Sequence, residues 1–209
     1  MPLDTWLAFF VASWLISLSP GAGAISCMTA GVRFGYRRGL WNILGLELGI
    51  MLVLIIVAVG VGAVLVASET AFTIVKWLGV GYLVWLGIQQ WRAPAAPIAL
   101  DGEVARGGTA RALVLRGFLV NATNPKGILF MLAVLPQFID PALPQFPQYA
   151  ICAVTLIFTD LVVMSAYTGL AARVLRLLHA PRHLRALNRA FGGVFVGAGA
   201  LLATFHRAA

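Results

Sequence analysis

Long apolar stretches alternate with short polar connections along this chain. The pattern predicts six apolar helices, each near the ~20 residues that a membrane crossing needs, at residues 5–32, 40–67, 70–91, 113–139, 148–172 and 190–205. The first stretch has no charged residue between Asp4 and Arg33. We therefore expect an all-α membrane protein with six transmembrane helices in a single transporter domain that covers residues 1–209.

The composition agrees with a membrane protein. Hydrophobic residues make up 61% of the chain and charged residues 11%, whereas soluble domains have about 45–50% and ~25%. The net charge of +8 would also fit a protein that binds nucleic acid. The arginines gather beside the apolar stretches, as membrane topology requires, and no nucleic-acid motif is present. We expect the lipid bilayer, and no nucleic acid, as a partner.

A cleaved signal peptide is the alternative for the first apolar stretch, since Ala22-Gly23-Ala24 resembles a cleavage site. A signal peptide begins with a positively charged region. Here the first residues contain Asp4 and no lysine or arginine. We therefore interpret this stretch as a membrane span.

The basic residues predict the orientation. The loops after spans 1, 3 and 5 hold three, four and five arginines, which is twelve of the fifteen basic residues. An excess of Lys and Arg marks the cytoplasmic side, so both termini are expected outside the cytoplasm. The third of these predicted loops contains Arg173, Arg176, Arg182, Arg185 and Arg189.

The two halves of the chain look like inverted repeats of three helices. We place repeat one at about 1–92, a loop at about 93–111 and repeat two at about 112–209. Each repeat begins with a span broken by proline, at Pro20 and at Pro125, because proline removes a helical hydrogen bond. Interrupted spans at corresponding positions point to a transporter site. In the first span, Ser19 is expected to cap a new helix that starts at Pro20.

Three charged residues lie deep within the predicted spans. Glu47, Lys126 and Asp160 are ~13–20 Å from the cytoplasmic arginines at helical rise, near the middle of a ~30 Å hydrocarbon core. Charges at that depth are functional candidates by default. Gly45 and Gly49, which flank Glu47, have the spacing of close helix packing.

These groups suggest a site for a small zwitterion. Two half-helix N-termini and Lys126 favour an anionic group such as a carboxylate, while Glu47 and Asp160 favour a cation or a proton. An amino acid, or a cationic ester of one, needs both. We hypothesise proton-coupled export, with Glu47 or Asp160 as the proton carrier. The alternative is a static ion pair between Lys126 and one acid that holds the halves together.

Several motifs together resemble the LysE/RhtB family of bacterial amino-acid exporters over essentially the whole chain. They are Ser19-Pro20-Gly21, Asn124-Pro125-Lys126, Leu135-Pro136-Gln137-Phe138, and Asp160 with Met164 and Tyr167. Within the family, the stretches at 19–25, 87–92 and 187–189 resemble the RhtB branch of homoserine and homoserine lactone exporters. The resemblance implies efflux of homoserine, its lactone or threonine across the inner membrane. In that membrane, the termini that the arginines place outside the cytoplasm are expected in the periplasm.

From depth and resemblance together we predict a substrate site. It comprises Ser19, Pro20, Gly21, Gly23, Glu47, Asn121, Asn124, Pro125, Lys126, Asp160 and Tyr167. The chain departs from the family pattern at Ala22, where a second proline is usual, and at Gly23, where a polar residue is common. Backbone groups around Pro20 to Gly23 would have to serve there.

The sequence leaves other functions open. A channel would need a continuous polar lining, an enzyme would need a nucleophile–base pair or metal cluster, and the exported amino acid could be another, such as leucine or lysine. His179 and His183 are expected in the basic loop. Cys27 and Cys152 lack metal or redox spacing, so no cofactor or metal is expected. The glycine faces leave open a homodimer.

Overall fold

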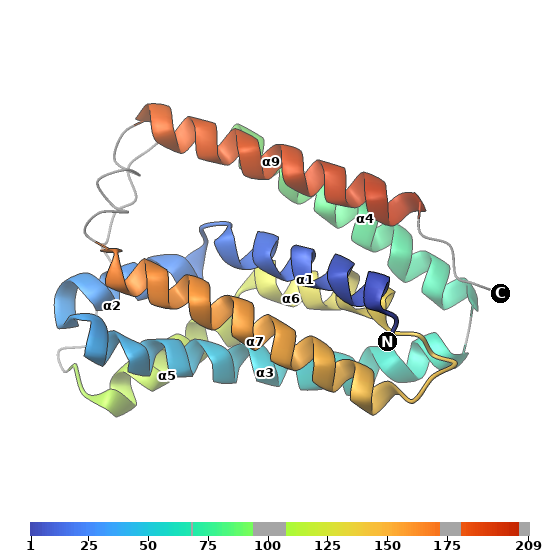
Figure 1. Ribbon diagram of the computed structural model, residues 1–209, viewed down its shortest axis with the longest axis horizontal. Coiled ribbons are helices and arrows are strands. Elements are labelled where there is room, and N and C mark those ends of the chain that lie inside the picture. The colour runs from blue at the N-terminus through green and yellow to red at the C-terminus, as the bar shows by residue number, and fades with distance from the viewer. Residues whose placement is uncertain (68, 94–107, 172–180, 205–209) are drawn as a thin grey trace.

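Figure 1 shows a computed structural model, which describes residues 1–67, 69–93, 108–171 and 181–204. The regular structure of these residues is entirely helical. The elements are α1 (Leu3–Leu18), α2 (Ala22–Phe34), α3 (Tyr36–Ala67), α4 (Glu69–Arg92), α5 (Ala110–Ala122), α6 (Pro125–Ala133), the 3-10 helix η1 (Leu135–Phe138), α7 (Gln145–Gly169) and α9 (Pro181–Thr204).

Two single helices and two bent pairs are long and apolar enough to cross a membrane. The single helices are α3 and α7, and the bent pairs are α1 with α2 and α5 with α6 and η1. The described residues therefore provide two to four candidate spans. The helices α4 and α9 have 24 residues each and lie alongside the others, but their described residues do not reach the same apolar length.

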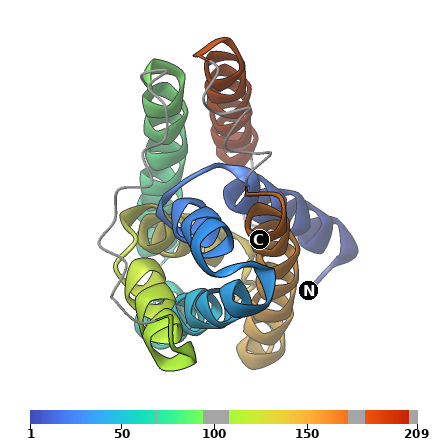
Figure 2. The ribbon, with the colours of Figure 1, turned by 90° about the vertical axis from the view of Figure 1, so that its left-hand side faces the viewer.

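When α1 with α2, and α5 with α6 and η1, are each taken as one bent unit, successive units run in alternating directions along the long axis of the molecule (Figure 1). The start of α1 and the end of α9 lie at the same end, and α2 and the start of α5 lie at the other. The pair formed by α4 and α9 stands beside the remaining helices rather than among them (Figure 2). The other helices surround the two breaks.

The basic stretch before the last span is helical where it is described. Because α9 already begins at Pro181, Arg182, Arg185, Arg189 and His183 lie on a helix, and their prediction as loop residues was wrong. A proline fits the first turn of a helix, where its missing N–H is not needed, and the arginine side chains are exposed and extend away from the apolar segment. The other residues predicted for this loop, Arg173, Arg176 and His179, are outside the described residues.

Glycines allow α3 and α5 to pack in backbone contact. A Cβ atom at Gly45 would collide with the carbonyl oxygen of Val114, and one at Gly117 would collide with that of Asn42. At Gly49 the added atom would lie 2.7 Å from the carbonyl oxygen of Phe118. The predicted packing role of Gly45 and Gly49 is confirmed, and this contact fixes Glu47 of α3 beside the second break.

The outer surface is apolar and the interior contains polar groups. Large exposed side chains include Val59 and Phe146, which are 75% and 85% exposed. In contrast, Ser13, Asn42 and Thr159 are fully buried. A surface of this kind is costly in water and suits a lipid environment.

Candidate functional site

The first break separates α1 from α2 by three residues and a bend of 55°. Ser19 ends α1, because its N–H donates to the carbonyl oxygen of Leu15. The second helix begins at Ala22, after Gly21 in an extended conformation. Our prediction of a helix start at Pro20 with a Ser19 cap was therefore wrong by two residues. The hydrogen bond from the Ser19 N–H to Leu15 makes Ser19 the C-cap of α1, so Ser19 does not act as the N-cap of α2.

The N-terminus of α2 has no side-chain cap. The first N–H groups of any helix have no partner within the helix, so this end offers donors and a partial positive charge. Gly21 and Gly23 leave its backbone accessible, because a Cβ atom at either position would meet side-chain atoms only at 3.7 Å or beyond. Backbone groups at this break are therefore open to a ligand, and their contact with substrate stays a prediction.

The second break lies between α5 and α6, with a bend of 50°. Asn124 caps α6, since its Oδ1 accepts a hydrogen bond from the backbone N–H of Lys126 at 3.1 Å. Pro125 occupies the first helical position, where no N–H is required. The predicted break at Asn124-Pro125 is confirmed. It directs the N-terminus of α6 towards the first break.

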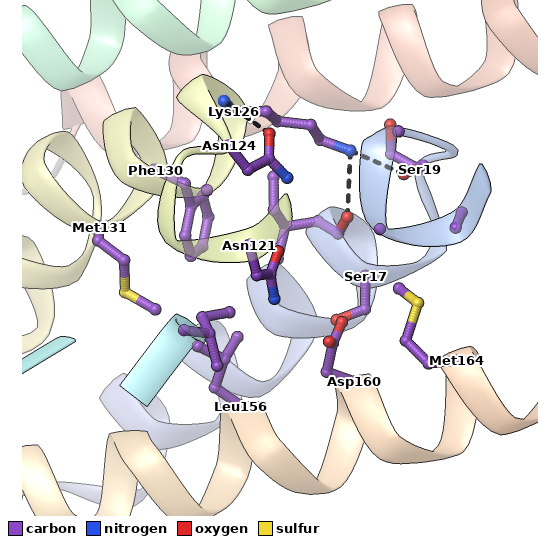
Figure 3. A pocket seen from close by; sticks show the side chains of 16 residues that line it. Ser17, Ser19, Asn121, Asn124, Lys126, Phe130, Met131, Leu156, Asp160 and Met164 are labelled. Atoms are coloured by element: carbon purple, nitrogen blue, oxygen red, sulfur yellow. Dashed lines mark hydrogen bonds between the residues drawn. The ribbon is translucent and has the colours of Figure 1, made fainter. Parts of the chain in front are cut away.

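Side chains from the second half of the chain bind the last carbonyls of α1. The Lys126 ammonium donates to the carbonyl oxygens of Ser19 at 2.7 Å and Ile16 at 3.2 Å (Figure 3). The Tyr167 hydroxyl donates to the carbonyl oxygen of Leu18 at 2.8 Å. Lys126 and Tyr167 thus cap a half-helix from across the molecule.

A cavity of about 50 Å³ lies between the two breaks and α7 (Figure 3). Seven of the predicted site residues line it: Ser19, Gly21, Gly23, Asn121, Asn124, Lys126 and Asp160. Its volume accommodates a few water molecules, whereas pockets for small molecules usually enclose ~300–1,000 Å³. In this conformation the cavity must widen before it can hold an amino acid.

Four of the predicted site residues do not line the cavity. Pro20 and Pro125 belong to the backbone of the breaks. Tyr167 lies beside Trp14, in a separate apolar hollow. Glu47 is 7% exposed and sits outside the lining. Sequence reasoning placed these four at the correct breaks and helices, but it could not determine which side of each backbone faces the cavity.

Two buried carboxyl groups lie next to each other in the interior. Asp160 from α7 is 6% exposed, and its carboxyl group interacts electrostatically with that of Glu47 from α3. Neither carboxyl oxygen of Glu47 has a partner with hydrogen-bonding geometry. Among the described residues, Lys126 makes no ion pair with either acid and binds carbonyls instead. The static ion pair is therefore absent from this conformation.

Ser17 is a cavity residue that the sequence analysis missed. It is 3% exposed, its hydroxyl makes no hydrogen bond, and it faces Asp160 (Figure 3). Ser13 and Ser17 are buried on one face of α1. Two serines four residues apart in an otherwise apolar helix share a face, and this polar stripe was the available signal.

An amide and a phenol hold the second break in place. The Asn121 side chain donates to the carbonyl oxygen of Leu46 in α3 at 2.9 Å. The Tyr82 hydroxyl of α4 donates to the carbonyl oxygen of Lys126 at 3.1 Å.

Within the described ranges, no group of three or more His, Cys, Asp or Glu residues could hold a metal ion.

The chain was compared with known proteins. Residues 14–205 match the family described as "LysE type translocator". This chain belongs to that family. A homoserine/homoserine lactone efflux protein of Salmonella typhimurium is 45% identical over 208 residues, which cover 100% of both chains.

More distant members cover the same length. An uncharacterized membrane protein of Vibrio cholerae is 39% identical over 206 residues and 98% of both chains. A leucine efflux protein of Enterobacter sp. is 30% identical over 209 residues, 98% of this chain and 97% of its own. No solved structure matches. The family resemblance expected from the sequence is confirmed, and the chain is a membrane translocator of the LysE type.

Proposed function

We propose that this translocator exports homoserine, homoserine lactone or threonine across the inner membrane in exchange for protons. The observation that carries the proposal is the cavity where two helix breaks, Lys126 and Asp160 meet. The similarity over the full chain to a homoserine/homoserine lactone efflux protein supports the substrate class.

The cavity has a suitable group for each end of an amino acid. The uncapped N-terminus of α2 and the ammonium of Lys126 favour a carboxylate. The carboxylate of Asp160 favours an ammonium group. A lactone of homoserine lacks the free carboxylate and would rely on Asp160 and on N–H donors to its carbonyl oxygen. The site therefore selects for the backbone of the substrate, and its size selects for a small side chain.

The paired carboxyl groups of Glu47 and Asp160 are the proposed proton carrier. Two ionised carboxylates side by side in a buried site repel each other, and a bound proton relieves the repulsion. An incoming substrate ammonium at Asp160 would also relieve it and could displace the proton. Competition of this kind exchanges a proton for a substrate at one site.

The proposed architecture is six transmembrane helices in two inverted repeats, with both termini in the periplasm. The first repeat contains the α1–α2 break and Glu47 on α3, and the second contains the α5–α6 break and Asp160 on α7. The alternating directions of the single helices and bent pairs in Figure 1 and the arginines that follow the first, third and fifth predicted spans support this arrangement.

Transport by the purified protein in proteoliposomes tests the function. With radiolabelled homoserine, we expect accumulation against its gradient only when a pH gradient is imposed. Lys126→Ala removes one charged group of the site, so its gradient-driven transport should fall to the level of protein-free liposomes. Full transport by Lys126→Ala would contradict a substrate site at the second break.

The same assay separates the alternatives. A channel would let homoserine equilibrate without accumulation at any pH gradient. Leucine or lysine moving in place of homoserine would retain the exporter and overturn the proposed substrate. Homoserine should compete with its own radiolabelled form, and leucine and lysine in equal excess should not.

A further inference from the structure

The C-terminal end of α1 has an arrangement that suits a small cation. The last carbonyls of a helix have no partner within it and carry a partial negative charge. At this break the carbonyl oxygens of Ile16 and Ser19 point to one place, which holds the Lys126 ammonium at 3.2 and 2.7 Å. The nitrogen is thus held by backbone oxygens and not by a carboxylate.

Two further oxygen-bearing side chains line the same cavity. Ser17 is 97% buried, and its hydroxyl group has no hydrogen-bond partner. The Asp160 carboxyl group faces it (Figure 3) and interacts electrostatically with Lys126. Carbonyl, hydroxyl and carboxyl oxygens are the ligands that hard cations prefer. In transporters with broken helices, half-helix C-termini and unwound carbonyls are where Na⁺ or H⁺ binds.

We propose that the end of α1 is a monovalent-cation site that Lys126 fills, in this conformation, with its own ammonium group. The side chain comes from the other half of the chain, so this tethered cation also joins the two helix breaks. If the protein is the exporter proposed above, its cycle needs no sodium ion, because the position that Na⁺ would take is occupied.

Removal of the lysine should expose the site to a free cation. We would measure thermal unfolding of the purified full-length protein in sodium chloride and in choline chloride at equal ionic strength. For Lys126→Ala we expect Tm to rise by about 2–4 °C or more in sodium, because an ion that binds only the folded state stabilises it. For the wild type we expect no difference between the two salts.

Two controls make the result specific. Lys76→Ala removes the other lysine of the chain and should show no sodium response. The double variant Lys126→Ala with Asp160→Asn loses the carboxylate of the site, and the sodium-dependent rise in Tm should shrink or vanish. Lys126→Met provides a second neutral variant if Lys126→Ala cannot be purified, and the same rise is expected.

Several outcomes would overturn the proposal. One is an equal Tm in both salts for the neutral Lys126 variants, and another is a sodium-specific rise in the wild type. A third, measurable on the wild type alone, is homoserine movement driven by a sodium gradient. Thermal unfolding needs no substrate, so its result is independent of whether homoserine is transported.

Discussion

The Tyr167 hydroxyl makes a single described hydrogen bond, to the carbonyl oxygen of Leu18 at 2.8 Å. Its ring lies beside Trp14 and outside the cavity between the breaks. Tyr167 therefore acts as a cap of α1 in this conformation. Its predicted contact with substrate is still untested.

Tyr167→Phe separates the two roles, because it keeps the ring and deletes the hydroxyl. The loss of one hydrogen bond costs about 1 kcal/mol, so Tm should fall by about 2–4 °C while the KM for homoserine stays unchanged. Tyr36→Phe is the matched control, since the Tyr36 side chain is exposed. A large rise in KM for Tyr167→Phe would instead place Tyr167 at the substrate.

Sequence reasoning at the scale of single residues found the charged groups but not their pairing. Depth along the helices placed Glu47, Lys126 and Asp160 together because helical rise is regular. It could not show that Lys126 donates to backbone carbonyl oxygens instead of pairing with an acid, or that both carboxyl oxygens of Glu47 lack a hydrogen-bond partner. Which groups Lys126 and Asp160 contact depends on how α6 and α7 are rotated about their axes, and this rotation arises from packing over the whole molecule.

At the scale of helices, the contact between α3 and α5 depends on glycine. Their backbones touch at Gly45 and Gly117, where any side chain would meet a carbonyl oxygen. The close contact brings Asn121 of α5 next to Glu47, since the Asn121 side chain donates to the carbonyl oxygen of Leu46. Glycines bring other helices equally close, since a Cβ atom at Gly31 of α2 would collide with the carbonyl oxygen of Thr168 in α7. We expect α3 and α5 to behave as one unit.

Gly117→Ala tests this contact. The added methyl group collides with the backbone of α3 at Asn42, and overpacking of this kind costs about 1–3 kcal/mol. We expect a lower Tm and a lower yield of folded protein. Gly81→Ala is the control, because a Cβ atom there has no neighbour within 4 Å, and alanine favours a helix over glycine. Equal stability of the two variants would contradict the close packing.

The breaks were predictable at this scale because proline and glycine act locally. Asn124-Pro125 gave the start of α6 correctly, and Ser19-Pro20 gave the first break within two residues. The start of α9 at Pro181 was missed, because arginines on an exposed helix face resemble a polar loop in sequence. The place of α4 and α9 beside the other helices (Figure 2) has no local signal at all.

For the molecule as a whole, the arginines predict the orientation in the membrane. Asp4 and Arg37 are exposed, and they lie near opposite ends of the first predicted span, which α1 and α2 form together. In a background without Cys27 and Cys152, which are both buried, a cysteine at position 4 should react with a membrane-impermeant maleimide in intact cells. A cysteine at position 37 should react only after the membrane is opened. The reverse pattern would contradict periplasmic termini.

The cavity also implies a change of shape during transport. With about 50 Å³ of space, the cavity has room for a few water molecules but not for an amino acid. The Lys126 and Tyr167 caps hold the first break to the second half of the chain. Opening of the cavity therefore requires either movement of these caps with α1 or their release, and a substrate carboxylate that competes for Lys126 would favour release.

We propose that an acid in this cavity couples export to protons, and Asp160→Asn tests this coupling. In proteoliposomes under a pH gradient, we predict that the wild type accumulates homoserine and that Asp160→Asn does not, although it inserts and unfolds at a similar temperature. Asp140→Asn, in the connection before α7, should accumulate homoserine like the wild type. Accumulation by Asp160→Asn that depends on the pH gradient as strongly as in the wild type would contradict the account.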